Sequence, residues 1–487
     1  MNLRNILLII TILGAIHDLD AQSNTMYYLT GVPQSYQLNP ATQPQCRFFI
    51  GVPILNSIYF ETYNSSFNIT NVIWNDPETN LVIHPLHPNA DLDQFYSNFS
   101  DENEYSFNLA ISPISFGLGI KEMYFTFDIT TKLSQAIYYP GDFFPLLISG
   151  GPDGSTYDFD ALGVEFNSYI EYGIGVSRRF FDMLQVGIRP KLLTGLGNIT
   201  STGNDVSLFT HHEVLQLDSY LNLQICAPGF IIPVDEEGVF DPSGEMVFDS
   251  TLSTFSDYRK LTMKNRGLGI DIGAHVKPIE GLTLSASIID LGYIKWKEYV
   301  HTATLDGSLT WEGIEYEVGE DTSQFLEYLL DTIKGNFEVS GSDDPYKTGL
   351  NPKLFIGGSY ALTRSLDVGL LSRFDFLHSG TKANVMIHAN WHPNTAFGLS
   401  ASYSPFGGRA STFGLGISLR AGPVSFYTVA DYRAFRYNLY KYESIPVFIS
   451  PANRSRFNTR FGLNLVFGSN KRKRLMKDRP MYYSSDN

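Results

Sequence analysis

The feature that most constrains this chain is the alternation of apolar and polar residues in its last third. In residues 412–420, Phe413, Leu415, Ile417 and Leu419 point to one side, and the small or polar residues between them point to the other. A period of two is typical of β-strands with one apolar and one polar face. The same alternation recurs in residues 354–362, 366–376, 383–391, 424–433 and 461–467.

Two architectures can use such strands. A soluble sandwich buries its apolar faces against each other, whereas a closed membrane barrel turns its apolar face to lipid and its polar face to a lumen. The chain is 14% aromatic, and its Tyr and Phe recur near strand ends, as in the interfacial girdles of membrane barrels. Because a helical membrane protein needs roughly 18 consecutive apolar residues, which this chain lacks, we predict a transmembrane antiparallel β-barrel.

The connections between strands predict the size of the barrel. Short turns and longer connections alternate along the chain, so they belong to opposite rims. With a first strand at about residues 48–63, this gives 14 strands and places both chain ends at the short-turn rim. Residues 206–227 also alternate, so the alternatives are 16 strands or a hairpin that rises above the membrane. The short turns are expected at residues 121–122, 178–182, 277–281, 363–365, 391–395 and 420–423.

The two ends of the chain complete the expected organisation. The apolar run 6–16 is too short to cross a bilayer and predicts a secretory signal peptide at residues 1–21, with an N-terminal anchor as the alternative. We expect a hatch segment at 22–46, an outer-membrane barrel with long outer loops at 47–468, and a basic periplasmic tail at 469–487. These expectations place the protein in the outer membrane of a Gram-negative bacterium.

Charge is distributed unevenly along the chain. Residues 201–265 carry ten acids against three bases, and residues 297–351 carry twelve against three, while the whole chain has a net charge of −15. The acidity therefore belongs to the outer loops, and the tail has a cluster of bases at 471–474. After a signal peptide and a lipid-facing strand, we expect this cluster to be solvated or to meet lipid headgroups or an acidic periplasmic partner, rather than nucleic acid.

Alternation also assigns polar side chains to the lumen. Both signs of charge occur there, which is typical of a hydrated network that stiffens the wall and holds a plug, although a transport path is the functional alternative. The predicted lumen network comprises Glu171, Arg189, Asp271, His275, Arg373, Asp375, His388 and Arg420.

Two further segments are candidate functional elements. The lead-in 22–45 mixes aromatic residues with turn formers, so we expect it to fold into the barrel mouth as a hatch, with Asn39, Pro40 and Ala41 forming a turn against the wall. An outer connection carries an aromatic cluster that either packs down as a lid or binds a hydrophobic ligand. The candidate ligand-binding residues are Tyr138, Tyr139, Phe143 and Phe144.

The sequence contains no catalytic or metal-binding motif. It lacks a Gly-x-Ser-x-Gly elbow, a His-Glu-x-x-His pair and a phosphate-binding loop. His388 and His392 lie four residues apart on one strand, roughly 13 Å by rise, which is too far to share a metal ion. Cys46 and Cys226 are expected on opposite sides of the membrane and therefore unpaired. We predict no catalytic residues, no metal and no cofactor.

Several short motifs resemble a known family. The Asn39-Pro40-Ala41 turn, the strand start at 49–53, residues 171–175 and 186–195, and the closing 460–464 are similar to a Bacteroidota outer-membrane family known only as a domain of unknown function. More remotely, that family is similar to long-chain fatty-acid transporter barrels and to barrels that accompany type IX secretion and gliding. The resemblance implies 14 strands and an N-terminal hatch, but it implies no substrate.

Two functions are consistent with these observations. The first is gated uptake of hydrophobic or amphiphilic small molecules, in which the hatch moves to open a path. The second is a non-transporting surface scaffold or an accessory of a secretion or gliding system, with the acidic loops 206–257 and 312–344 facing an envelope protein partner. Outer-membrane lipid is the expected surrounding in both cases.

Overall fold

The computed structural model describes most of the barrel and part of its loops. The expected signal peptide and basic tail lie outside the described residues. Much of the acidic loops 206–257 and 312–344 also lies outside them. The described residues are 25–29, 31–66, 74–75, 82–83, 85, 87, 90–181, 183–201, 204–211, 214–231, 247–248, 263–311, 337–377, 380–406, 412–432, 437–442, 445–451 and 456–468.

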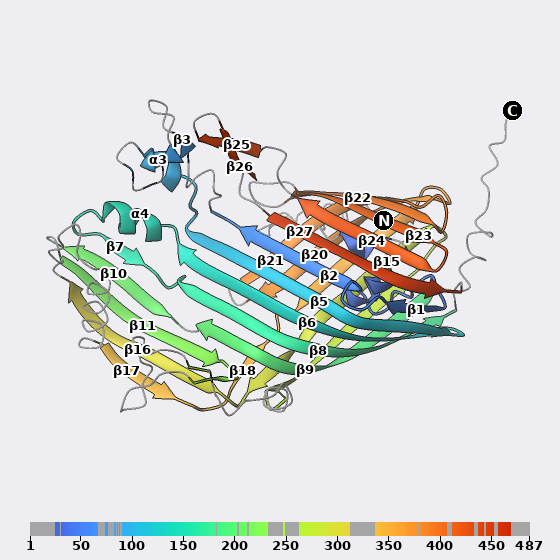
Figure 1. Ribbon diagram of the computed structural model, residues 1–487, viewed down its shortest axis with the longest axis horizontal. Coiled ribbons are helices and arrows are strands. Elements are labelled where there is room, and N and C mark those ends of the chain that lie inside the picture. Colours follow the sequence, from blue (N-terminus) through green and yellow to red (C-terminus); the bar gives the residue numbers. More distant parts are fainter. Residues whose placement is uncertain are drawn as a thin grey trace, which may run out of the picture.

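The chain forms a closed antiparallel barrel of 14 strands (Figure 1). Two short pieces, β1 (Phe48–Gly51) and β2 (Ser57–Asn64), together make the first strand. The others are β5 (Glu102–Ile120), β6 (Met123–Pro140), β8 (Gly163–Phe180), β9 (Leu184–Ser201), β14 (Arg266–Val276), β15 (Leu282–Trp296), β19 (Lys353–Ala361), β20 (Leu366–Leu377), β21 (Gly380–Trp391), β22 (Phe397–Phe406), β23 (Thr412–Ala421), β24 (Val424–Tyr432) and β27 (Arg456–Phe467).

The last strand closes the barrel onto the first. Strand β27 pairs with β24 on one side and with β1 and β2 on the other, so that Phe467 lies opposite Phe48 and Phe461 opposite Ile58. No sheet edge is therefore left open at this seam, as a membrane-spanning sheet requires. The predicted count of 14 strands is confirmed.

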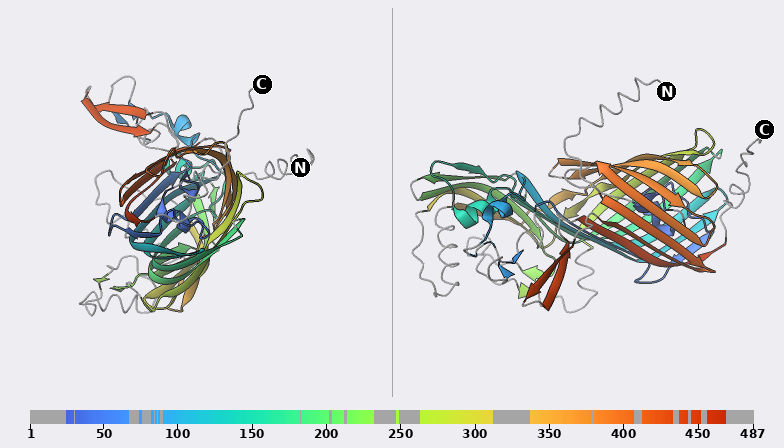
Figure 2. Two further views of the ribbon diagram at one scale, coloured as in Figure 1. Left: turned by 90° about the vertical axis from the view of Figure 1, so that its right-hand side faces the viewer. Right: turned by 90° about the horizontal axis from the view of Figure 1, so that it is seen from above.

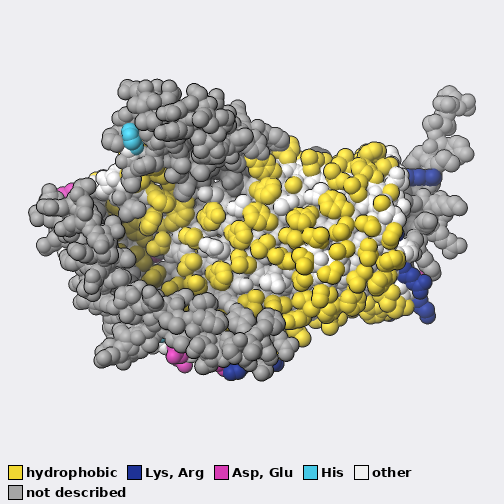
Figure 3. Space-filling model, in the orientation of Figure 1, with side chains coloured by type: hydrophobic (Ala, Val, Ile, Leu, Met, Phe, Trp, Pro, Cys, Tyr) yellow, Lys and Arg dark blue, Asp and Glu magenta, His cyan; other side chains and the backbone are white. Residues whose placement is uncertain are grey.

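The apolar faces of the strands point outward. On β23, for example, Phe413, Leu415 and Leu419 are 41%, 61% and 44% exposed. Figure 3 shows that hydrophobic side chains cover much of the visible face of the barrel, with Lys and Arg at the short-turn end on the right. Within the described residues, no helix is both long and apolar enough to cross a bilayer.

A second sheet region continues beyond the barrel at the long-loop end. It is built from β7 (Thr156–Asp158), β10 (Asp205–His211), β11 (Val214–Cys226), β16 (Val300–Trp311) and β17 (Phe337–Ser342). Strand β9 continues beyond Arg266, the first residue of β14, and there it pairs with β11, so that Asn198 lies opposite Cys226. Strands β7, β10, β11, β16 and β17 lie at the left in Figure 1. We call this sheet the extension. The hairpin at 206–227 therefore rises above the barrel and adds no strand to it.

Short elements complete the described structure. Strand β18 (Tyr346–Gly349) pairs with the end of β15, and three small hairpins lie in outer connections. The helices are η1 (Thr25–Tyr27), η2 (Pro33–Gln37), α3 (Leu92–Tyr96) and α4 (Phe143–Ser149). The hairpins are β3 (Trp74–Asn75) with β4 (Val82–Ile83), β12 (Phe230–Ile231) with β13 (Val247–Phe248), and β25 (Tyr437–Tyr442) with β26 (Ile445–Pro451).

Candidate functional site

Residues 25–29 and 31–46, which come before β1 in sequence, lie inside the barrel. We call residues 25–46, described except for position 30, the inner segment; it contains η1 and η2 and is visible within the ring of strands in the left view of Figure 2. Most of its side chains are buried, including Tyr36 at 1% and Gln34 at 0% exposure. The described part of this stretch is thus enclosed by the barrel, and its action as a hatch stays a prediction.

Side-chain hydrogen bonds fix the inner segment to the wall. The Thr25 hydroxyl lies 2.6 Å from that of Ser402 and also donates to Asp431. The Gln34 side-chain amide donates to Asn56 at 2.7 Å and to Asn464 at 2.6 Å. These contacts join the segment to β22, β24, β27 and the break between β1 and β2. The segment is thus held by several contacts. Each neutral hydrogen bond contributes about 0.5–1.5 kcal/mol net, and the one to the Asp431 carboxylate about 1.5–3 kcal/mol.

Three apolar clusters add to this attachment. Met26, Leu29 and Val32 pack against two residues of β24, and Tyr27 packs against inward residues of β15, β19, β20 and β21. Tyr36 shares a third cluster with Cys46, Phe49, Tyr124 and Val466. Inward apolar residues therefore gather where the segment lies.

The predicted turn at Asn39-Pro40-Ala41 rests on two glycines. The Asn39 side-chain oxygen accepts a hydrogen bond from the Ala41 amide at 2.9 Å, which closes the turn. Gly187 of β9 and Gly273 of β14 lie directly opposite each other beneath it. A Cβ at Gly187 would lie 2.2 Å from the Pro40 carbonyl oxygen, and one at Gly273 would lie 2.0 Å from the Asn39 side-chain oxygen. Only glycine leaves room for the turn at this point of the wall.

A buried cluster of charged residues lies beside the segment. Arg189 donates to Asp271 at 2.7 Å and contacts Asp128 and Glu171. Lys132 contacts Glu171 and Asp290 at 2.9 Å each, and Lys191 lies 2.7 Å from Asp290. We call Asp128, Lys132, Glu171, Arg189, Lys191, Asp271 and Asp290 the charge cluster. Four acids meet three bases, with Lys353 at 3.6 Å from Asp290 as a fourth base, so the charges balance.

An irregularity in β15 places one of these acids. Asp290 has a φ of 60°, which is rare for a residue other than glycine, and lies where the pairing of β14 with β15 shifts register. The bulge turns its carboxylate inward among the lysines, and the Asp290 amide donates to Asp271 at 2.8 Å. Because the strain persists in the middle of a strand, the surrounding ion pairs must stabilise it.

Tyr36 connects the inner segment to the charge cluster. Its hydroxyl donates to Asp128 at 3.1 Å. Burial, together with the nearby Asp128 charge, raises the pKa of Tyr36 well above its ordinary value, so the phenol keeps its proton and remains a donor. The position of the segment and the arrangement of the charges are therefore linked through one hydrogen bond.

We expect Tyr36→Phe to loosen the inner segment. A hydrogen bond to a charged group contributes about 1.5–3 kcal/mol, so the displaced state should gain population by roughly 10- to 100-fold. Alkylation of the buried Cys46 by a maleimide, followed by intact mass, measures this population. Tyr28→Phe is the matched control, because it removes a bond of 2.8 Å to the neutral Ser285. Equal labelling rates in the two variants would contradict the proposed link.

The inner segment lies between two cavities. The outer cavity, towards the long-loop end, has a volume of about 240 Å³ and is bounded in part by Met26, Gln37 and Leu38. The mouth cavity, at the short-turn end, measures about 1220 Å³ and is bounded by Tyr27, Tyr28 and residues 42–45. The same segment thus forms a wall of both cavities.

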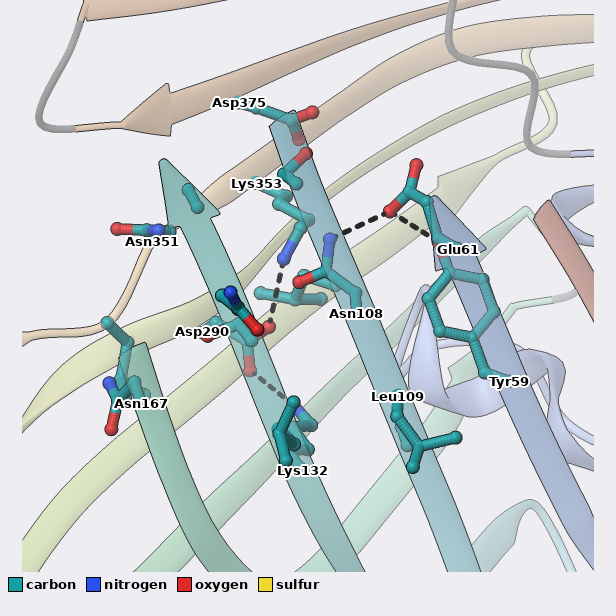
Figure 4. Close-up of a pocket in the computed structure, with 18 of the residues that line it drawn as sticks. Tyr59, Glu61, Asn108, Leu109, Lys132, Asn167, Asp290, Asn351, Lys353 and Asp375 are labelled. Carbon is teal, nitrogen blue, oxygen red and sulfur yellow. Dashed lines mark hydrogen bonds and ion pairs between the residues drawn. The ribbon is translucent and has the colours of Figure 1, made fainter. Parts of the chain in front are cut away.

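The outer cavity has a mixed lining. Figure 4 shows Lys132 of β6 and Lys353 of β19 directed at Asp290 of β15, and Asn108 and Tyr59 directed at Glu61. Leu38, Phe355 and Val429 also line the space. Such a surface can contact both the polar and the apolar part of one molecule.

The structure separates the predicted lumen network into several sites. Only Glu171, Arg189 and Asp271 meet in the charge cluster. Arg373 and Asp375 form their own ion pair at 2.7 Å and line the outer cavity. The other three lie nearer the short turns: His275 contacts Thr42 at 2.9 Å, His388 stacks on Tyr28 with ring centroids 4.1 Å apart, and Arg420 lines the mouth cavity. Arg420 thus lies in the mouth cavity, apart from the charge cluster, and the joint role of the eight residues stays a prediction.

The candidate aromatic residues lie partly in a strand rather than in a loop. Tyr138 and Tyr139 belong to the end of β6, and Tyr138 lines the outer cavity. Phe143 and Phe144 belong to α4, where Phe144 packs edge-on or tilted against other rings, including Tyr139 and Phe99 of the α3 region. The rings largely contact each other, and their role in ligand binding stays a prediction.

Lys132 and Asp290 were missed as members of the site. Lys132 lies four residues after Asp128 on the same strand, so alternation alone places it on the same face as that buried acid. Asp290 interrupts an apolar stretch, and a charged residue there was the available signal. The two cysteines are both free and buried, which confirms that they do not pair.

The comparisons with known proteins identify a family. Residues 40–431 match the model of a family of unknown function, DUF5723. This chain belongs to that family. No curated protein sequence matches it.

Several solved barrels are similar in outline. The toluene transporter TbuX of Ralstonia pickettii matches with 10% identity and a TM-score of 0.43, over 93% of this chain and all of that one. A FadL homologue of Pseudomonas aeruginosa (9%, 0.38) and the toluene transporter TodX of Pseudomonas putida (9%, 0.38) each cover 92% of this chain and 99% and 98% of their own. Because these identities and TM-scores are low, we infer the function from the geometry of this chain alone.

Proposed function

We propose that this protein is an outer-membrane channel for hydrophobic or amphiphilic small molecules, closed at rest by its inner segment. The observation that carries the proposal is the place of that segment, which separates an outer cavity from a mouth cavity inside one closed barrel. In this orientation the long loops face the cell exterior and the short turns face the periplasm, as is usual for outer-membrane barrels.

The attachment of the segment supports a gate. It is held by hydrogen bonds to side chains such as Ser402, Asn56 and Asn464 and by small apolar clusters. Among the described residues no disulfide ties it to the wall, and its main-chain link is the one into β1. Such contacts can break and reform in a local opening without unfolding the barrel. The mixed lining of the outer cavity supports an amphiphilic passenger, because lysines, asparagines and apolar side chains share one surface.

A reversible lock tests the gate. Thr25 and Ser402 have hydroxyl oxygens 2.6 Å apart, so Thr25→Cys with Ser402→Cys, in a Cys46→Ala, Cys226→Ala background, should form a disulfide. We expect oxidation to reduce entry of the lipophilic dye N-phenyl-1-naphthylamine to the level of cells without the barrel, and reduction to restore it. Ser402→Cys alone is the control. Equal dye entry in the locked and unlocked states would overturn the proposal.

The extension favours a second candidate function. Its five strands stand beyond the barrel at the long-loop end, where a scaffold would meet a partner (Figure 1). Described parts of the acidic loop regions 206–257 and 312–344 belong to it, including most of β10 and all of β11 and β17. A crosslinked pull-down that repeatedly recovers one envelope protein supports this role, and the absence of any reproducible partner contradicts it.

A further inference from the structure

The mouth cavity has an excess of positive charge. Four basic residues line it against two acids, Glu280 and Asp367. The bases are Arg179, Lys277, Arg364 and Arg420, and they come from four different places around the short-turn rim. They therefore present positive charge from several sides of one open space of about 1220 Å³.

Two of these guanidinium groups retain donors for a ligand. Arg179 makes a hydrogen bond of 3.5 Å to the side-chain oxygen of Gln43, and Arg420 donates to the Gly422 carbonyl at 3.2 Å. Among the described residues, neither takes part in a salt bridge with a carboxylate. Each has five N–H donors in a planar fork that suits carboxylates.

We propose that the mouth cavity binds an acidic, extended peptide segment of a periplasmic protein. The positive charges are spread over four strand ends, so a ligand must carry several negative charges along its length to reach them all. A volume above the usual 300–1,000 Å³ of small-molecule pockets also fits a peptide. Charge complementarity supplies both the attraction and the choice of partner.

Two other occupants fit less well. The tail that follows β27 in sequence carries bases at 471–474, 477 and 479, so its charge has the same sign as the cavity. Lipid headgroups surround the outside of the rim, where Arg178 is exposed and stacks on Phe180 at 4.8 Å. The four cavity bases instead line the interior of the mouth.

A bound peptide would also contact the inner segment. Residues Thr42, Gln43, Pro44 and Gln45 line the same cavity, and Arg179 contacts Gln43 directly. A peptide carboxylate that pairs with Arg179 would replace the hydrogen bond from Arg179 to Gln43 of the inner segment. This inference requires only that the short-turn end faces the periplasm, and it holds whether or not small molecules pass through the barrel.

Binding of a defined probe tests the inference. The full chain in neutral detergent is titrated against dye-labelled decaglutamate at low salt, and fluorescence anisotropy gives the affinity. We expect Arg179→Gln with Arg420→Gln to weaken binding by about five- to tenfold, since each exposed charge pair contributes up to about 1 kcal/mol. Lys277→Gln with Arg364→Gln should have a similar effect if the first pair fails to fold.

The control pair is Lys121→Gln with Arg178→Gln, which removes the same net charge from the turn between β5 and β6 and from the end of β8, both outside the cavity lining. It should change the affinity by less than about twofold. No binding of decaglutamate, or an equal loss in the control pair, would overturn the proposal. So would a mouth-pair variant that binds decaglutamate normally but loses phosphatidylglycerol vesicle binding, because the site would then be a lipid site.

Discussion

A methyl group added at Gly187 is expected to displace the inner segment. Its Cβ would lie 2.2 Å from the Pro40 carbonyl oxygen and 2.5 Å from the Ala41 nitrogen, and these are backbone atoms that no side-chain rotation can move aside. Overpacking of this kind costs about 1–3 kcal/mol, so Gly187→Ala should raise the alkylation rate of Cys46 by roughly 5- to 150-fold. Cys46 is 3% exposed and packs against Tyr36 and Phe49, so labelling requires displacement of the segment.

A matched substitution separates displacement from general damage. Gly269 lies on the same face of β14 as Gly273, but a Cβ there would meet no atom closer than 3.5 Å, which is ordinary contact. Gly269→Ala should therefore label at the native rate, whereas Gly273→Ala should behave like Gly187→Ala. A native labelling rate for Gly187→Ala in an intact barrel would show that the turn does not depend on these glycines. If conductance or dye entry rises together with labelling, the displaced state is also the open one.

Loss of Arg189 is expected to cause the largest loss of stability. Arg189→Met leaves Asp128, Glu171 and Asp271 in the interior with only the lysines to compensate them. Removal of one partner from a buried ionic group costs about 3–5 kcal/mol, and here three carboxylates share the loss. The guanidinium unfolding midpoint of the barrel in detergent measures this change.

Two further variants define the cause. Arg178→Met removes an exposed arginine from the adjacent strand and should change stability by less than about 0.5 kcal/mol. Adding Asp128→Asn and Asp271→Asn to Arg189→Met should restore most of the loss, because the unpaired charges are then removed. An Arg189→Met barrel as stable as Arg178→Met would mean that the charge cluster does not stabilise the fold.

The two predictions concern two different uses of the barrel interior. The glycine pair provides space for the inner segment, while the charge cluster stiffens the wall beside it. Tyr36 connects them through Asp128. The Lys132 side chain is 25% exposed in the outer cavity. A ligand that breaks the ion pairs of Lys132 would therefore alter the position of the inner segment through the contacts between them.

Local sequence was sufficient to predict the barrel itself. Alternation assigns every strand residue to one of two faces, and the contrast of short turns with long connections orders the strands around a ring. Because the lipid face must be apolar and the sheet must close, strand number, closure and the outward direction of residues such as Leu415 followed from the sequence. The turn at Asn39-Pro40-Ala41 was also predictable, since its residue types favour that conformation.

In the regular parts of the strands, the sequence alone determined which side of the wall a residue faces, but only the tertiary structure decided which residues meet. Arg189 and Arg420 both point inward, yet one joins three carboxylates and the other lines the mouth, because their neighbours depend on strand register and position around the ring. A bulge at Asp290 changes the alternation locally, and no periodic pattern specifies it. The space for the Asn39-Pro40-Ala41 turn at Gly187 and Gly273 arises only when β9 and β14 pair, because this places the two glycines, 86 positions apart in sequence, opposite each other.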